Sequence, residues 1–204
     1  MIPFAPSAER NKDAILAALR PHLAHRRRVL EIGSGTGQHA LHMTQALPQL
    51  VWQCSDLPGA IPGIAARLES EGTERTPPPL ALDVAAPPWP LPAAEAPDAF
   101  DAVFTANTLH IMSFAHVGQF FARIGEILAP GGLCCVYGPM KYGGAFTTES
   151  NAEFDAQLRA RDPQSGIRDF EALDALAQAQ GLTLLEDIAM PANNQLLIWR
   201  RTGG

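Results

Sequence analysis

Hydrophobic positions along the chain alternate between short continuous runs and helical spacing. A continuous apolar run of about four to eight residues is typical of a buried strand, whereas apolar residues three and four apart are typical of an amphipathic helix. Strands are predicted at 28–32, 50–56, 80–82, 100–105 and 133–139, and helices at 9–25, 38–48, 61–72 and 114–132. Strands and helices that alternate in this way favour a parallel sheet with helices on both faces.

The pattern changes after residue 138. The elements predicted there are two helices and then two strands, at 150–162, 168–181, 182–191 and 194–201. The first of these helices begins at Ser150, with Glu153 three residues later as in a capping box. The closing strands are joined by a short turn, which predicts an antiparallel hairpin. The expected fold class is α/β, a mostly parallel sheet with a C-terminal antiparallel hairpin.

The composition favours one globular domain, residues 1–204. Of the 204 residues, 47% are hydrophobic and 18% are charged, enough apolar surface for a core of its own. The net charge of −6 does not favour binding to nucleic acid or to an anionic membrane. We therefore expect a small-molecule ligand. The N-terminal stretch does not resemble a signal peptide, and no stretch of 18 apolar residues occurs, so we expect a cytoplasmic protein. We expect it to be a monomer or a homodimer.

Three glycines, Gly33, Gly35 and Gly37, follow the first predicted strand in the stretch VLEIGSGTGQH. A Walker A loop needs a lysine directly after its last glycine, and here Gln38 follows Gly37. The dinucleotide fingerprint is also incomplete, because Gln38 stands where its third glycine is expected. Glu31, two residues before the first glycine, disfavours a pyrophosphate and suits a cationic ammonium group.

Acidic residues also end the next two predicted strands. Asp56 can accept hydrogen bonds from both hydroxyls of a ribose. Asp83 can accept a hydrogen bond from the exocyclic amine of an adenine. An aspartate before a proline-rich loop also often caps a turn. Together with Glu31, these acids describe a ligand with an ammonium group, a ribose and an adenine. S-adenosylmethionine matches that description.

On these residues the chain resembles the class I S-adenosylmethionine-dependent methyltransferases. The resemblance extends over nearly the whole chain and includes the LAPGG turn before the fifth strand. More narrowly, four segments resemble the methyltransferase-like 26 family, FAPSAERNKDAIL, EIGSGTGQHA, ANTLHIM and YGPMKYGGAFTTESNAEFDAQLRARDPQSGIRD. The resemblance implies the Rossmann-like, seven-stranded methyltransferase fold with a terminal hairpin and S-adenosylmethionine as cofactor. It supplies no substrate.

Carried onto this chain, the resemblance assigns the cofactor contacts to the ends of successive strands. These residues are Glu31, Gly33, Ser34, Gly35 and Gly37 for the methionine end, Asp56 and Leu57 for the ribose, Asp83 and Val84 for the adenine, and Asn107 near the sulfonium. It also suggests that residues 1–25 form a lid with Arg10 and Asn11 turned inward. The simpler interpretation is that Ser7 or a neighbour caps the first helix. Residues 138–168 are expected to be a substrate-side insertion.

Three side chains are candidates for the methyl-transfer site. His110, after the fourth strand, is either a general base or a histidine that packs against the loop. Tyr137 and Lys141 follow the fifth strand, where loops build the substrate pocket; the alternative is a flexible loop with a solvated lysine. No metal site is predicted, because His39 and His42 lack a third ligand and suit surface or cofactor-facing positions.

The sequence thus predicts a methyltransferase that uses S-adenosylmethionine and acts on an unidentified small-molecule acceptor. Methyl transfer from a sulfonium needs mainly positioning and desolvation, so no catalytic dyad has to be visible. The alternative is a non-catalytic protein that uses the cofactor pocket as a sensor or as a partner-binding surface. A pocket that no second cavity reaches would favour that alternative.

Overall fold

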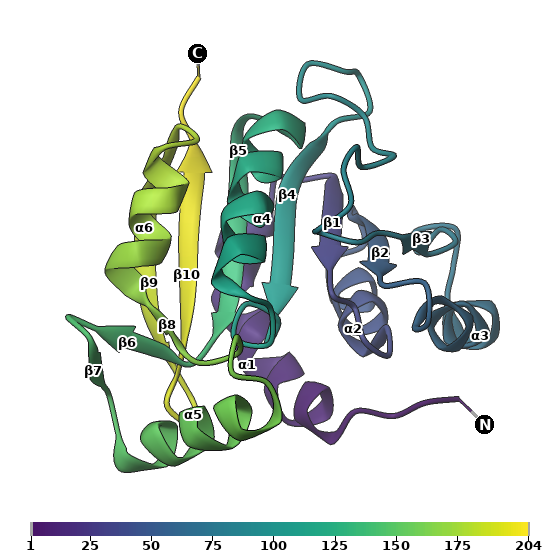
Figure 1. The fold of residues 1–204 in the computed structure, drawn as a ribbon. Helices are drawn as coiled ribbons and strands as arrows, with labels where there is room; N and C mark the ends of the chain where they lie inside the picture. The colour runs from purple at the N-terminus through teal and green to yellow at the C-terminus, as the bar shows by residue number, and fades with distance from the viewer. Residues whose placement is uncertain (1, 204) are drawn as a thin grey trace.

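A seven-stranded sheet forms the centre of the computed structural model, which describes residues 2–203 (Figure 1). Its order is β3-β2-β1-β4-β5-β10-β9. The strands are β1 (Arg28–Ile32), β2 (Val51–Asp56), β3 (Leu80–Ala81), β4 (Phe100–Ala106), β5 (Leu128–Gly138), β9 (Leu182–Met190) and β10 (Asn194–Arg201). Strands β1 to β5 are parallel, and β10 is antiparallel to both of its neighbours. The predicted α/β class, seven-stranded sheet and terminal hairpin are confirmed.

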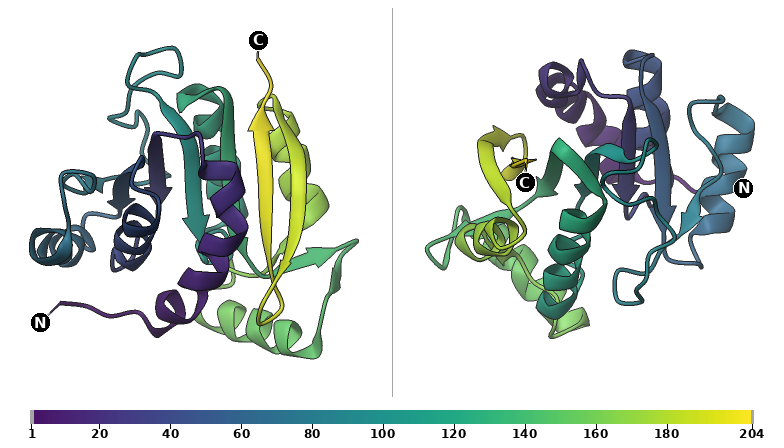
Figure 2. Two further views of the ribbon diagram at one scale, coloured as in Figure 1. Left: turned by 180° about the vertical axis from the view of Figure 1, so that it is seen from behind. Right: turned by 90° about the horizontal axis from the view of Figure 1, so that it is seen from above.

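Helices cover both faces of this sheet (Figure 2). Those on one face are α1 (Pro6–Leu23), α2 (Gln38–Ala46) and α3 (Ile61–Glu71), and those on the other are α4 (Phe114–Ile127) and α6 (Phe170–Gln178). Helix α5 (Glu149–Arg161) lies instead across the edge where β4 ends (Figure 1). Within the described residues, no helix has both the length and the apolar character that a membrane span requires.

Burial on both faces explains why the strands read as continuous apolar runs. Val29 belongs to the core beneath α1, whereas its neighbour Leu30 belongs to the core beneath α4. Cys134 and Cys135 are divided between the same two cores and both remain free thiols, as their adjacent positions on a strand require. Residues of the central strands therefore pack against an apolar core on either face, whereas the edge strand β9 leaves residues 185–187 exposed.

Two helix starts differ from the prediction. Helix α1 begins at Pro6 after Ala5 and has no side-chain cap, so the proposed Ser7 cap is wrong. Pro21 lies in the last turn of this helix, where the buried Leu23 still packs on the sheet. Helix α5 is capped by Thr148, whose hydroxyl accepts from the Asn151 amide at 3.2 Å, rather than by the predicted Ser150.

The region around β5 also differs in detail. The helix predicted over 114–132 ends at Ile127, because β5 starts at Leu128 and includes the Pro-Gly-Gly sequence at 130–132. The pairing of β5 with β4 shifts its register at this point. A small second sheet of order β7-β6-β8 was not predicted. Its strands are β6 (Met140–Tyr142), β7 (Ala145–Phe146) and β8 (Arg168–Asp169). Strands this short have no periodicity to detect, and they form because residues distant in sequence are brought together.

The topology determines where a ligand can bind. Strand β1 lies between β2 and β4, so the chain direction across the sheet reverses beside β1. Ligands of open α/β sheets bind at such a switch point, beyond the carboxyl ends of the strands. The start of α1 and helix α5 lie at this same edge (Figure 1).

The core beneath α4 provides a stability test. Phe121 is fully buried and meets Phe120 and Trp199 in edge-to-face contacts with ring centroids 5.2 and 5.7 Å away. We expect Phe121→Ala to lower the free energy of unfolding by about 3–5 kcal/mol, measured by urea denaturation. Phe114→Ala, in the same helix but 46% exposed, should change it by no more than about 0.5 kcal/mol. Equal effects of the two substitutions would contradict this packing.

Candidate active site

The glycine turn after β1 is shaped by backbone geometry. Gly33 has a φ of +75°, and a Cβ on it would lie 2.6 Å from Thr108 Oγ1, so a side chain here would push against the end of β4. Gly35 has a φ of +59°, and a Cβ there would meet no atom within 4 Å. Gly33 therefore allows close packing against Thr108, while Gly35 leaves backbone open to a ligand.

A cavity of about 550 Å³ lies beside this turn; we call it the glycine-turn cavity. Its lining residues are Ile32, Gly33, Gly35, Asp56, Leu57, Leu82, Asp83, Val84, Ala85, Asn107, Thr108, Ile111, Met112 and His116. Seven of the predicted cofactor residues are among them. The volume is within the roughly 300–1,000 Å³ of small-molecule sites.

Asp56 and Asp83 are both held by backbone amides at this cavity. The two carboxylate oxygens of Asp56 accept from Gly35 N and Leu57 N, each at 2.7 Å. Each oxygen keeps a further lone pair for a ligand hydroxyl. One oxygen of Asp83 accepts from Ala85 N at 2.9 Å, so Asp83 does cap its turn, and its other oxygen remains available for a ligand.

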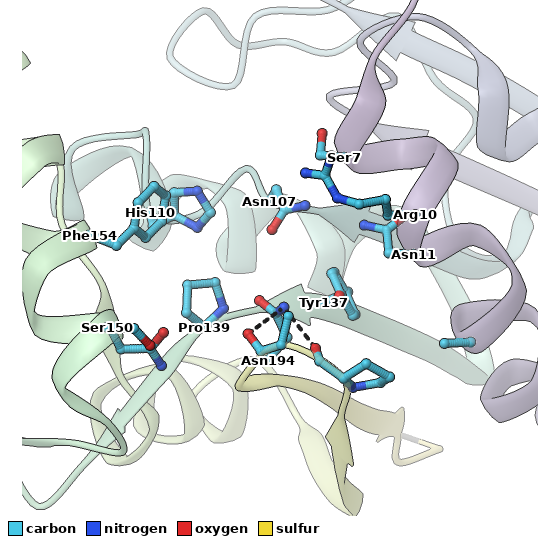
Figure 3. Close-up of a pocket in the computed structure, with 14 residues that line it drawn as sticks. Ser7, Arg10, Asn11, Asn107, His110, Tyr137, Pro139, Ser150, Phe154 and Asn194 are labelled. Carbon is cyan, nitrogen blue, oxygen red and sulfur yellow. Dashed lines mark hydrogen bonds between the residues drawn. The ribbon is translucent and has the colours of Figure 1, made fainter.

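A second cavity of about 830 Å³ lies between α1, α5 and the β9–β10 hairpin (Figure 3); we call it the α5 cavity. Its lining residues are Ser7, Arg10, Asn11, Ala14, Asn107, His110, Tyr137, Pro139, Ser150, Asn151, Phe154, Pro191, Ala192 and Asn194. Arg10, Asn11, His110 and Tyr137 were predicted site residues. Among the residues described by the structure, Arg10 is the one at this cavity with a permanent charge, and none of them brings a carboxylate to its lining.

Asn107 lines both cavities. It follows β4 with a φ of +58°, a left-handed conformation that asparagine tolerates better than most residues. Its amide donates to Tyr137 O at 2.9 Å, which holds it against β5. The two cavities therefore meet at the end of β4, at the residue that was expected to face the sulfonium.

His110 lines the α5 cavity and packs edge-on against Phe154 at a centroid distance of 5.3 Å. Burial, assisted by the positive charge of Arg168, lowers the pKa of His110 to about 4. The imidazole is therefore uncharged at neutral pH and can accept one hydrogen bond and donate another. Both the packing role and contact with a ligand are compatible with this position.

Tyr137 and Lys141 are placed differently. Tyr137 is buried at the wall of the α5 cavity, and burial raises the pKa of its phenol, which therefore stays protonated at neutral pH. Lys141 lines neither cavity, because β6 turns its side chain outward and its ammonium lies 5.5 Å from the ring centroid of Phe146. The structure does not bring Lys141 to the site.

Glu31 lies beneath the glycine turn rather than in a cavity. Only 1% of it is exposed, and its carboxylate accepts from Trp52 Nε1 at 3.0 Å and faces His39 Nδ1 at 3.5 Å. His39 Nε2 in turn donates to Asn11 Oδ1 at 2.8 Å. His39 is thus buried rather than on the surface. This network joins β1, β2 and α2 to Asn11 of α1, which lines the α5 cavity.

Ser34 and Gly37 also lie outside both cavities. The Ser34 hydroxyl accepts from Ser55 N at 3.1 Å, which fastens the turn to β2. Gly37 stands at the start of α2 with a φ of +74°. Each of these residues shapes the turn that Gly33 and Gly35 present to the cavity.

The residues that the sequence did not reveal come from tertiary neighbours. On the α5 side they include Asn151 and Phe154, three apart on one face of α5, and Asn194 at the start of β10. On the glycine-turn side they include Ile111 and Met112, an apolar pair directly after the polar turn. The spacing of the α5 pair and the apolar pair are weak signals, and neither distinguishes a pocket wall from an ordinary core position.

The low pKa of His110 predicts a pH dependence of stability. The unfolded histidine takes up its proton near pH 6.5, whereas the folded one does so near pH 4. The stabilisation is therefore complete above pH 6.5 and is lost as the pH falls towards 4, a loss of about 3 kcal/mol. His110→Asn should lose less stability over this interval in urea denaturation. His25→Asn, at an exposed position, should follow the wild type, and parallel curves for all three proteins would contradict the assignment.

Comparison with known proteins gives the same fold and names a family. Solved structures that match over most of this chain include the S-adenosylmethionine-dependent methyltransferase SibL in its apo form (21% identity, TM-score 0.79, 97% of this chain and 56% of that chain). Human N-acetylserotonin methyltransferase in complex with S-adenosylmethionine matches at 15% identity and TM-score 0.81, over 97% of this chain and 53% of that chain. The mitomycin 7-O-methyltransferase MmcR matches at 18% identity and TM-score 0.81, over 96% of this chain and 54% of that chain.

This chain thus spans about half the length of these proteins, and the likeness establishes a shared fold. A family match extends over residues 2–201, and so the chain belongs to the family described as Protein of unknown function (DUF938).

Proposed function

We propose that this protein is a methyltransferase that binds S-adenosylmethionine in the glycine-turn cavity and a small acceptor molecule in the α5 cavity. The observation that carries the proposal is the meeting of the two cavities at Asn107. Methyl transfer is a direct displacement between two ligands, so it requires two adjoining sites. The resemblance of four segments to methyltransferase-like 26 proteins supports the same proposal, as does the fold shared with structural neighbours that are methyltransferases.

The glycine-turn cavity suits the nucleoside part of the cofactor. The free lone pairs of Asp56 would accept the two ribose hydroxyls, and the outer oxygen of Asp83 would accept the adenine amine. Leu57 and Ile111 are 54% and 56% exposed although apolar, and both line this cavity. A planar base between them would bury this apolar surface, which is favourable.

The methionine end would extend past Gly33 and Gly35 towards α1. Arg10 projects into the α5 cavity beside Asn107 and Asn11, where it can pair with the cofactor carboxylate (Figure 3). Glu31 would act from beneath, by fixing His39 and through it Asn11, instead of contacting the ammonium group directly. Helix α1 would thereby form one wall of the site, in keeping with the proposed lid.

The acceptor would lie against α5 within the 138–168 insertion. The sulfonium of the bound cofactor supplies a methyl group that is already activated for displacement. Asn107, His110 and Tyr137 present polar atoms to the α5 cavity and would orient the acceptor, while Phe154 and Pro139 exclude water. Because His110 is uncharged at neutral pH, it can accept a hydrogen bond from an acceptor hydroxyl as that group attacks.

The non-catalytic alternative is a protein that binds the cofactor as a sensor. A glycine-turn cavity with no second cavity beside it would have favoured that role. The α5 cavity of about 830 Å³, which shares Asn107, favours catalysis instead.

Isothermal titration with S-adenosylmethionine tests the cofactor assignment. Asp56→Ala removes a charged acceptor from the ribose position, so we expect the affinity to fall about 10- to 100-fold. Asp98→Ala, an exposed aspartate in the loop before β4, should bind like the wild type. Undetectable binding to the wild type, or equal affinities for the two variants, would overturn the proposal.

A further inference from the structure

Four successive carbonyls after β4 are all bound by one distant segment of the chain. Residues 107–112, which we call the β4 turn, carry these carbonyls, and residues 164–168 supply the donors. The bonds are Arg168 Nε to Leu109 O at 3.0 Å, Gly166 N to His110 O at 2.8 Å, Ser165 Oγ to Ile111 O at 3.1 Å, and Arg168 Nη2 to Met112 O. The backbone of the β4 turn is thereby fixed from outside.

Arg168 makes the two outer bonds of this set. It is 8% exposed, and its Nη2 also donates to Gln164 O at 3.0 Å. All three of its hydrogen-bond acceptors in the described residues are backbone carbonyls, and none is a carboxylate. Burying a guanidinium is costly, and here the compensation comes from carbonyls of two separate segments. The planar fork of an arginine can bridge them, whereas a lysine ammonium on its single stem cannot do so equally well.

The 164–168 segment is itself held by helix α5. Ile167 N donates to Asp155 Oδ1 at 2.6 Å, and the other oxygen of the buried Asp155 accepts from Arg159 Nε at 2.7 Å. Gly166 has a φ of +146°, and a Cβ there would lie 2.4 Å from Arg159 Nη2. The segment therefore has little freedom to shift relative to the helix that lines the α5 cavity.

The side chains of the β4 turn point to both cavities. Asn107 lines both, His110 lines the α5 cavity, and Ile111 and Met112 line the glycine-turn cavity. Because the carbonyls of His110, Ile111 and Met112 are held by residues 164–168, the directions of these three side chains depend on a segment that lines neither cavity. The β4 turn thus separates the two cavities, and its position is fixed by hydrogen bonds from residues 164–168.

We propose that Arg168 is a positioning residue that fixes the β4 turn, and with it the partition between the two cavities, through its bonds to Leu109 O and Met112 O. The identities of the two ligands rest on the proposed function, but the positioning itself does not. Loss of the guanidinium frees the turn, which disturbs Ile111 and Met112 on one side and His110 on the other.

Arg168→Met keeps an apolar stem and removes all three bonds, and Arg168→Lys keeps the charge. The control is Arg161→Met, an exposed arginine at the end of α5. The first readout needs no ligand: hydrogen exchange of the Ile111 amide, which donates to Thr108 O at 3.1 Å within the turn. We expect exchange at least about tenfold faster in Arg168→Met, a smaller increase in Arg168→Lys, and no change in the control.

The second readout is the titration of His110 by NMR. The charge of Arg168 lowers the pKa of this imidazole, and its neighbours Phe154 of α5 and Gly138 of β5 contribute no charge; Arg10 lines the same cavity from α1. Arg168→Met should raise the pKa of His110 from about 4, because it removes the positive charge. Arg168→Lys keeps that charge, so the pKa of His110 should rise less. A purely structural role would not order the two variants in this way.

The third readout is the affinity for S-adenosylhomocysteine, which should fall about tenfold in Arg168→Met although Arg168 does not line the glycine-turn cavity. If the wild type binds no S-adenosylhomocysteine, the proposed function fails, while exchange and titration still decide the role of Arg168. If Arg168→Met does not fold, Ser165→Ala removes only the bond to Ile111 O and should still accelerate exchange at Ile111. Exchange, titration and affinity that match Arg161→Met would overturn the positioning role.

Discussion

The buried carboxylate of Glu31 is the interaction on which the arrangement of the site depends. It lies at the end of β1, where it accepts from Trp52 of β2 and faces His39 of α2, and His39 reaches Asn11 of α1. A carboxyl group buried this deeply needs such partners, and they fix the relative positions of three elements. The glycine turn is built directly above it. The shape of the glycine-turn cavity thus depends on the contacts of the Glu31 carboxylate with Trp52 and His39.

The second constraint acts from the other side of the site. The β4 turn separates the two cavities, and the 164–168 segment binds four of its carbonyls. The glycine turn is therefore fixed from beneath by side chains, and the β4 turn from behind by a segment far along the chain. Neither device uses the side chains of Asp56 and Asp83, whose oxygens keep lone pairs at the glycine-turn cavity. Support of the two turns and the polar lining of the cavity are thus supplied by different groups.

Much of the glycine-turn cavity could be predicted from the sequence, because it depends on local patterns. Asp56 at the end of β2, Asp83 after β3, and Gly33 and Gly35 after β1 follow from short-range periodicity and from topology, and the structure brings them to one cavity. The α5 cavity was harder to predict. Lys141 was expected there from its place after β5, but β6 turns it away. Asn151, Phe154 and Asn194 line the cavity only because α5 and the hairpin fold over the sheet edge.

By itself, the sequence determined the layers, the strand alternation and the glycine turn, since burial on two faces demands continuous apolar strands and a parallel sheet demands helical crossovers. Only the tertiary structure decided the role of each polar residue. Glu31 and Asp56 look alike as acids at strand ends, yet one is buried beneath the turn and the other lines a cavity. Arg168 shows the same limit, because Leu109 O and Met112 O, which it binds, lie more than fifty residues away and carbonyls leave no mark in a sequence.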